Sequence, residues 1–143
     1  MPFPEPYPGL VIRFSYLWHQ EHQKGAEEGI KDRPCAVVMV MVEDAGSEVL
    51  VMPITHTPPY DPFLAIEIPL KTRQRLGLDD DPCWVVCSEL NQFCWPGPDL
   101  RRLPGTDRIA YGCLPGKLFE AIKERALFLA RGKKLRAVKR VDV

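Results

Sequence analysis

The sequence predicts a mainly β protein, a small antiparallel barrel followed by one C-terminal α-helix, in a single domain over residues 1–143. Proline makes up 15 of the 143 residues, roughly twice its usual share of ~5%, and so many helix breakers exclude a long helical bundle. Short apolar segments alternate with turn residues as far as position 113. Beyond residue 115 the apolar residues follow a 3.6-residue period, which is typical of a helix packed on a sheet.

The first half of the chain contains the most regular strand patterns. Residues 9–18 are rich in β-formers and predict the first strand. Residues 19–32 are polar and predict an exposed loop that is long enough to indicate a function. Residues 34–42 form a continuous apolar run, which predicts a buried strand, and a turn at 45–47 connects it to a return strand at 48–54. Pro53 lacks an N–H, so we expect an edge or a bulge there.

The second half contains shorter strands and then the helix. Strands are expected at 65–68, 84–88 and 109–113, whereas prolines break the segment 93–103 into short pieces. A proline-rich loop at 57–62 and an acidic turn at 76–82 separate these strands. The apolar residues at helical spacing are Leu118, Phe119, Ile122, Ala126 and Leu129. They predict a helix that begins at Pro115 and ends before Gly132, followed by a basic tail at 133–140.

The net charge of zero conceals an uneven distribution along the chain. Residues 1–100 carry 7 Lys and Arg against 15 Asp and Glu, whereas residues 101–143 carry 12 against 4. This asymmetry indicates an anionic partner for the C-terminal third. A helix and tail that are basic only because they are solvated would explain it equally well.

Cysteine usage and apolar runs predict a cytoplasmic protein without a membrane segment. The longest apolar run, residues 35–42, has eight residues, and a membrane span needs ~20. The proline-rich N-terminal lead-in has no basic region and no apolar stretch, so it does not resemble a secretory signal. The five cysteines are an odd number, and we interpret them as buried, reduced thiols.

Motifs for metal and nucleotide cofactors are missing from the sequence. It contains neither C-x-x-C nor H-E-x-x-H, and its glycines fit no phosphate-binding loop. His19 and His22 lie three residues apart without a carboxylate to frame a metal site. We therefore expect no metal and no cofactor.

Candidate functional residues lie at the open ends of the predicted hairpin. Arg33 precedes the buried strand, where the following proline restrains it, and its planar guanidinium suits a phosphate. Thr55 and His56 follow the return strand. If 34–42 pairs with 48–54, Arg33 and Thr55 are neighbours on one rim of the barrel. The same spacing is also compatible with a salt-bridged Arg33 and a Thr55 that merely ends a strand.

Four segments follow one another in an order known from one protein family. They are PGLVIRF, a loop with Gly-x-Glu, the run DRPCAVVMV and the segment VLVMPIT. In this order they resemble the MazF/PemK family of toxin ribonucleases. Glu28, five residues before Arg33, is the better spaced match to the family's acidic loop residue. The resemblance extends to the terminal helix and so covers most of the chain.

The resemblance implies an SH3-like barrel that forms homodimers and cleaves single-stranded RNA without metal, as the toxin of a type II toxin–antitoxin module. The family's matching residues lie in its cleavage site, which implies catalytic roles for Arg33 and Thr55. Glu28 and His56 are the candidate general base and acid. The candidate RNA-binding residues are Lys31, Arg101, Arg102, Lys133, Lys134 and Arg136. The implied protein partner is an acidic antitoxin peptide encoded next to the toxin.

The sequence also departs from the family pattern in three places. Leu10 stands where the family usually has an acidic residue, and the first loop is several residues longer. Residues 89–97 replace the family's Asp-Gln-Ile-Arg-Thr segment, which contributes to the floor of the site. These departures leave a second function open: a catalytically silent SH3-like module that binds RNA or a protein with the same rim.

Overall fold

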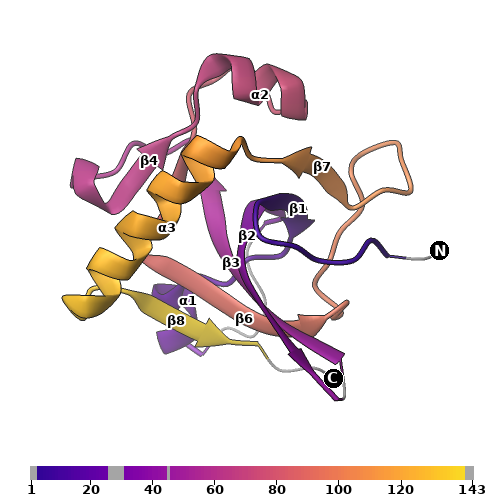
Figure 1. Cartoon of the computed structure of the whole chain (residues 1–143), viewed down its shortest axis with the longest axis horizontal. Helices are drawn as coiled ribbons and strands as arrows, with labels where there is room; N and C mark the ends of the chain where they lie inside the picture. Colours follow the sequence, from indigo (N-terminus) through magenta and orange to yellow (C-terminus); the bar gives the residue numbers. More distant parts are fainter. Residues whose placement is uncertain (1–2, 26–30, 45, 141–143) are drawn as a thin grey trace.

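Strands form most of the regular structure (Figure 1). The computed structural model describes residues 3–25, 31–44 and 46–140. Its strands are β1 (Leu10–Phe14), β2 (Arg33–Glu43), β3 (Gly46–Thr55), β4 (Ala65–Glu67), β5 (Trp84–Val86), β6 (Glu89–Trp95), β7 (Ala110–Cys113) and β8 (Arg136–Lys139). Its helices are α1 (His19–Gln23), the 3-10 helix η1 (Pro62–Leu64), α2 (Leu70–Leu76) and α3 (Gly116–Arg131). The protein is mainly β with one long helix near its C-terminus, as the sequence predicts.

The antiparallel meander β1–β2–β3 forms the centre of the sheet. Val11 of β1 lies opposite Ala36 of β2, and β2 pairs with β3 along most of its length. Cys35, Ala36 and Val37 are fully buried, as their continuous apolar run predicts. A bulge follows Val37, and beyond it Met39 is exposed. The predicted hairpin of the two longest strands is confirmed.

Pro53 lies inside β3, but not at an edge or a bulge as expected. On one side it pairs with Cys35 of β2. On its other side, β3 pairs with β6 along 47–51 and with β5 at Ile54 and Thr55. On that side no described residue pairs with Met52 or Pro53. Because proline cannot donate to a ladder, it fits the gap where β3 changes partner.

The described strands form an open sheet with the order β4-β5-β3-β2-β1-β7, to which β6 is joined through β3 and β8 through β6. A closed barrel is therefore not confirmed. β8 runs parallel to β6, with Glu89 opposite Arg136 and Gln92 opposite Lys139. The interpretation of 133–140 as a basic tail is wrong, because its backbone joins the sheet and Val138 is buried.

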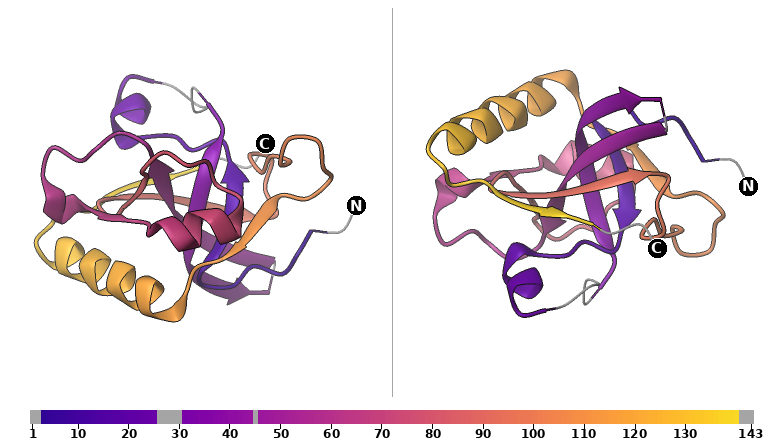
Figure 2. Two further views of the ribbon diagram at one scale, coloured as in Figure 1. Left: turned by 90° about the horizontal axis from the view of Figure 1, so that it is seen from above. Right: turned by 90° about the horizontal axis from the view of Figure 1, so that it is seen from below.

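Helix α3 packs against the sheet along one apolar side. Its fully buried residues are Ile122 and Leu129, and Pro115 and Gly132 flank its ends as predicted. The partly buried residues on the same core cluster are Leu118, Phe119 and Ala126. In Figure 2, α3 and α1 lie on opposite sides of the sheet. Within the described residues, no helix combines the length and apolar character that a membrane-spanning helix requires.

Two short helices lie where the sequence predicts no helix. α1 falls inside the segment 19–32 and buries none of its residues. α2 precedes the acidic turn and buries Thr72, Arg73 and Leu76. Neither helix is long enough to show an apolar period, so the sequence pattern does not reveal them.

Three cysteines belong to the core. Cys35, Cys83 and Cys87 are buried, whereas Cys94 and Cys113 are exposed, so the interpretation of all five cysteines as buried is wrong for these two. Burial raises the pKa of the Cys83 thiol to about 11 and that of the Cys87 thiol to about 12, and it raises the pKa of Cys35 as well. At neutral pH these thiols stay protonated, so they act as small apolar side chains rather than nucleophiles.

A buried arginine fixes the end of β8. Arg140 is only 5% exposed, and its Nη2 lies 3.1 Å from Oδ1 of Asp99. Its Nη1 donates to the carbonyl oxygen of Ser15 at 2.6 Å and to Oδ1 of Asn91 at 3.1 Å. The guanidinium also lies 5.5 Å from the ring centroid of Phe14. These contacts tie the chain after β8 to β1, to β6 and to the loop that contains Asp99.

Candidate functional site

Arg33 and Thr55 lie opposite each other at the open end of the β2–β3 hairpin. Arg33 is the first residue of β2 and Thr55 the last of β3, and each lies two positions beyond the pair of Cys35 with Pro53. Both line a cavity of about 730 Å³, here called the main cavity, and both line a second cavity of about 390 Å³. The structure therefore brings the two residues to one place, on a wall that the two cavities share.

The main cavity is lined by distant parts of the chain. Trp18 comes from the segment before α1, Tyr60 from the loop after β3, and Glu89 from the start of β6. Lys134 comes from the connection between α3 and β8, and Arg136 from the start of β8. The walls thus combine cationic and aromatic side chains, a composition typical of sites for single-stranded nucleic acid.

Arg33 carries a partly buried charge. Its Cζ lies 5.0 Å from the ring centroid of Trp18, a distance typical of a cation–π contact. Burial lowers the pKa of Arg33 from its ordinary value, and nearby Cys35, Glu21 and Tyr16 oppose that shift, but a guanidinium remains charged at neutral pH. Its buried Nε has no hydrogen-bond partner among the described residues. Arg33 therefore offers a fixed cation to a ligand in either cavity.

Thr55 has a hydroxyl proton available for a ligand. Its Oγ1 accepts a hydrogen bond from the backbone N–H of Thr57 at 3.1 Å. This bond uses the oxygen as an acceptor and also fixes its position at the strand end. The O–H of Thr55 can therefore donate into a cavity.

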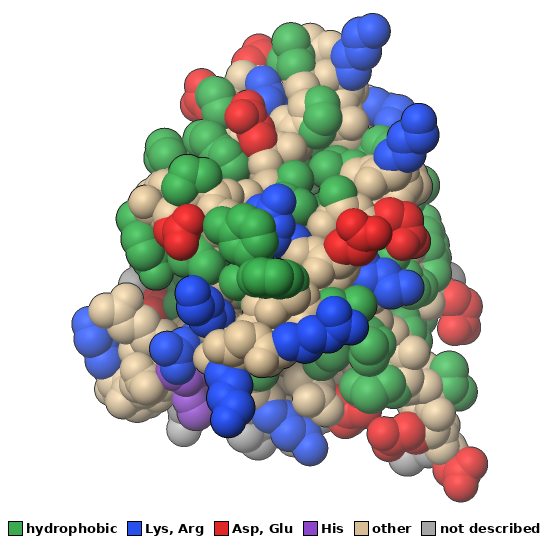
Figure 3. All heavy atoms as spheres, turned by 60° about the vertical axis from the view of Figure 1, so that its left-hand side comes forward, with side chains coloured by type: hydrophobic (Ala, Val, Ile, Leu, Met, Phe, Trp, Pro, Cys, Tyr) green, Lys and Arg blue, Asp and Glu red, His purple; other side chains and the backbone are tan. Residues whose placement is uncertain are grey.

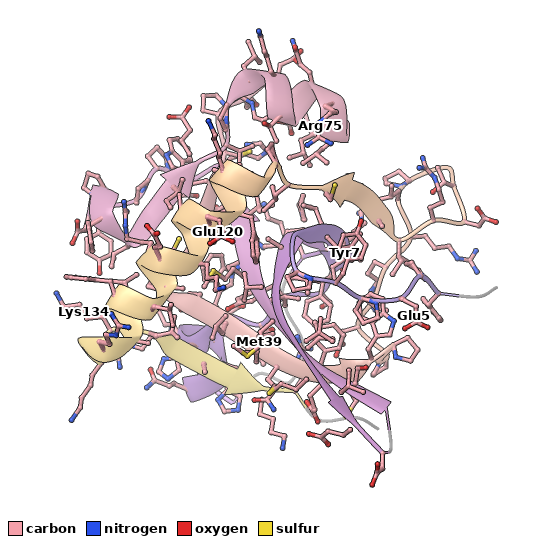
Figure 4. All side chains as sticks on the ribbon, in the orientation of Figure 1. Glu5, Tyr7, Met39, Arg75, Glu120 and Lys134 are labelled. Carbon is pink, nitrogen blue, oxygen red and sulfur yellow. The ribbon has the colours of Figure 1, made fainter. Side chains whose placement is uncertain are left out.

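Three of the six predicted RNA-binding residues line the main cavity. These are Lys31, Lys134 and Arg136. Lys134 lies just beyond the C-terminal end of α3, at the left of Figure 4. Figure 3 brings that side of the molecule forward, and Lys and Arg side chains gather across the lower half of the face. The basic surface thus extends beyond the cavity walls.

The other three predicted RNA-binding residues lie elsewhere. Arg101, Arg102 and Lys133 are not among the described residues that line the two cavities. Nε of Arg101 lies 3.5 Å from Oδ1 of Asp32, and its Nη1 donates to the carbonyl of Pro98 at 2.8 Å. Arg101 therefore stabilises its own loop, a role that a count of charges along the sequence does not distinguish from ligand binding.

His56 lines the second cavity together with Arg33 and Thr55. Its Nδ1 lies 2.9 Å from the carbonyl oxygen of Pro82, and its Nε2 lies 2.9 Å from Oδ2 of Asp79. Both partners are acceptors, so only a doubly protonated ring donates to both at once. His56 can therefore serve a ligand only by giving up one of these two acceptors.

Glu28, the other candidate for proton transfer, lies outside the described residues. Sequence reasoning missed Glu89, whose Oε1 accepts hydrogen bonds from the Tyr16 hydroxyl at 3.0 Å and from the His19 N–H at 3.1 Å. Burial raises the pKa of Glu89, although these two hydrogen bonds and the nearby Arg136 lower it. Its donors lie about 70 positions earlier in the sequence, so only the fold reveals this site.

Metal-binding geometry is not found in the described part of the chain, where no three His, Cys, Asp or Glu side chains are grouped to hold an ion. In comparisons with known proteins, no protein-family model and no curated protein matches this chain.

Proposed function

We propose that this protein is an endoribonuclease that cleaves single-stranded RNA without a metal ion. The observation that carries the proposal is the common wall of two cavities, which contains Arg33 and Thr55 and is surrounded by basic and aromatic side chains. The resemblance of the sequence motifs to the MazF/PemK family supports the same conclusion.

RNA supplies its own nucleophile in such a reaction. The 2′-oxygen attacks the adjacent phosphorus, the bond from phosphorus to the 5′-oxygen breaks, and the products are a 2′,3′-cyclic phosphate and a 5′-hydroxyl. Arg33 stabilises the negative charge that develops on the phosphoryl oxygens. Thr55 donates its hydroxyl proton to one of those oxygens.

Proton transfer needs a base for the 2′-hydroxyl and an acid for the leaving 5′-oxygen. His56 is our candidate acid, because its arrangement with Asp79 and Pro82 fits the protonated ring. To act, it exchanges one of these acceptors for the leaving oxygen. Glu28 is our candidate base, on the strength of the family resemblance.

The family resemblance supplies the biological part of the proposal. In this proposal the protein is the cytoplasmic toxin of a type II toxin–antitoxin module, an SH3-like barrel that works as a homodimer. An acidic antitoxin peptide, encoded next to the toxin, competes with RNA for the basic walls of the main cavity. Lys31, Lys134 and Arg136 are the residues for which they compete.

The proposal is tested by single-turnover cleavage of end-labelled single-stranded RNA. Arg33→Ala is expected to lower the rate by roughly 10²–10³-fold, because it removes a charge that stabilises the transition state. Arg33→Lys is expected to rescue only part of the rate, since an ammonium lacks the planar fork of donors. A chelator is expected to have no effect, and an RNA with 2′-deoxy at the cleaved position is expected to stay intact.

Arg108→Ala serves as the matched control, because Arg108 is exposed and does not line the described cavity walls. Full activity of Arg33→Ala, or loss of wild-type activity in chelator, refutes the mechanism. Binding of RNA without cleavage under any condition instead supports the silent binding module.

A further inference from the structure

A third hollow lies beside α1. It has a volume of about 580 Å³ and is lined by Trp18, Gln20, Glu21, Lys31, Arg33 and Glu89. We call it the α1 pocket. Four of these residues, Arg33 among them, also line the main cavity. A ligand whose phosphate lies at Arg33 can therefore extend directly into the α1 pocket.

Trp18 forms a fixed aromatic wall of this pocket. The Cζ of Arg33 lies 5.0 Å from the centroid of its ring. The Trp18 and Tyr16 rings pack in a T-shaped arrangement, with their centroids 5.3 Å apart and an interplanar angle of 72°. The backbone N–H of Trp18 donates to Oε1 of Glu21 at 3.0 Å. Because the ring is already held in place and only partly buried, a base can stack on it without ordering it first.

Glu89 supplies a carboxylate to the same pocket. Its Oε1 takes both hydrogen bonds that described residues donate to it, from Tyr16 and from the backbone of His19. No described residue donates to Oε2, which is left for a ligand. An ionised carboxylate only accepts, so it pairs with a base edge that presents an N–H₂ group.

We propose that the α1 pocket binds one nucleobase of the RNA, next to the cleaved bond, and selects a base that carries an exocyclic amino group. Trp18 stacks on the base, and Oε2 of Glu89 accepts from its amino group. Cytosine, adenine and guanine carry this group. Uracil lacks it, and the two carbonyl oxygens that flank its single N–H repel a carboxylate. This inference rests on the proposed function, because it places the phosphate of the same RNA at Arg33.

The experiment compares two RNAs that cannot be cleaved. Fluorescein-labelled 2′-O-methyl hexamers of cytidine and of uridine lack the nucleophile, so anisotropy reports binding alone. We expect the full-length protein to bind the cytidine hexamer at least about 10-fold more tightly, within the range expected for one base contact. Glu89→Gln is expected to bring the ratio near 1, because an amide also offers an N–H₂ to uracil.

Two further variants separate stacking from selection. Trp18→Ala is expected to weaken binding of both hexamers by roughly 5- to 150-fold, the usual effect of one stacked base, without changing their ratio. Trp18→Phe keeps a ring and is expected to restore much of the affinity. Glu43→Gln removes the same charge at the exposed end of β2 and is expected to change neither affinity.

The outcomes distinguish this inference from the nuclease proposal. Equal affinity of the wild type for both hexamers refutes the base subsite, and so does a preference that survives Glu89→Gln in a variant with wild-type circular dichroism. If that variant fails to fold, the ratio of the wild-type affinities for the cytidine and uridine hexamers still tests the inference. Preference for cytidine without any cleavage of ordinary RNA supports the base subsite and refutes the nuclease proposal. Cleavage without a preference for cytidine supports the nuclease proposal and refutes the base subsite.

Discussion

Replacement of Arg140 by alanine tests how firmly β8 is attached to the sheet. The substitution removes the 3.1 Å ion pair with Asp99 and two hydrogen bonds, to Ser15 and Asn91. Breaking a buried ion pair from one side typically costs 3–5 kcal/mol, because the remaining charge stays buried. An unfolding entropy of about 2.1 cal/mol/K per residue amounts to about 0.3 kcal/mol/K for 143 residues. The loss of 3–5 kcal/mol therefore lowers the melting temperature by roughly 10–17 °C.

Urea unfolding followed by circular dichroism measures this loss. A double-mutant cycle with Asp99→Asn isolates the pair, and we expect the double variant to lose less stability than the sum of the two single variants by at least about 1–2 kcal/mol. A cost below about 1 kcal/mol for Arg140→Ala refutes the reasoning, since a surface ion pair contributes no more than that.

Two further predictions concern the main cavity. In the double variant Lys134→Gln, Arg136→Gln, the slope of log K for single-stranded RNA against the logarithm of the salt concentration is expected to become less steep by roughly 1.4, or about 0.7 for each lost phosphate contact. An unchanged slope shows that the two residues do not contact the RNA backbone. Substitutions are used because a deletion after Gly132 would remove β8. For Glu89, the raised pKa means that the folded state binds its proton more tightly, so this group contributes stability at low pH that is lost as pH rises from its ordinary pKa through the raised one. In Glu89→Gln, the free energy of unfolding is therefore expected to fall less steeply over this pH range than in the wild type. If the two proteins lose the same free energy of unfolding over this range, the burial argument is contradicted.

Local sequence patterns predicted the elements in which buried apolar residues are continuous or recur at a regular spacing. β2 is an unbroken apolar run, and α3 has apolar residues at helical spacing, so both were found close to their observed bounds. β8 was missed because only Val138 among its four residues is buried, and the basic residues around it looked like a solvated tail. Whether an arginine such as Arg140 is buried depends on Asp99, a partner 41 positions away.

The residues of the candidate site also fall into those that the sequence predicts and those that only the fold brings together. Arg33 and Thr55 are the two ends of one hairpin, so their proximity follows from a register that can be read along a short stretch of sequence. Trp18 and Glu89 come together only because β1 and β6 are both in place in the folded sheet. Glu89 alone looks like any surface carboxylate, and the sequence contains no local sign that the Tyr16 hydroxyl will donate to it.

The order of the elements along the chain, in which β8 follows α3, sets the order in which the main cavity is assembled during synthesis. The ribosome makes Arg33, Thr55 and Glu89 long before Lys134 and Arg136, and α3 lies between the two groups. A parallel neighbour cannot be added by a tight turn, so α3 must cross the sheet before β8 reaches β6. Nascent chains that end at Gly132 thus contain Arg33 and Thr55 but neither Lys134 nor Arg136.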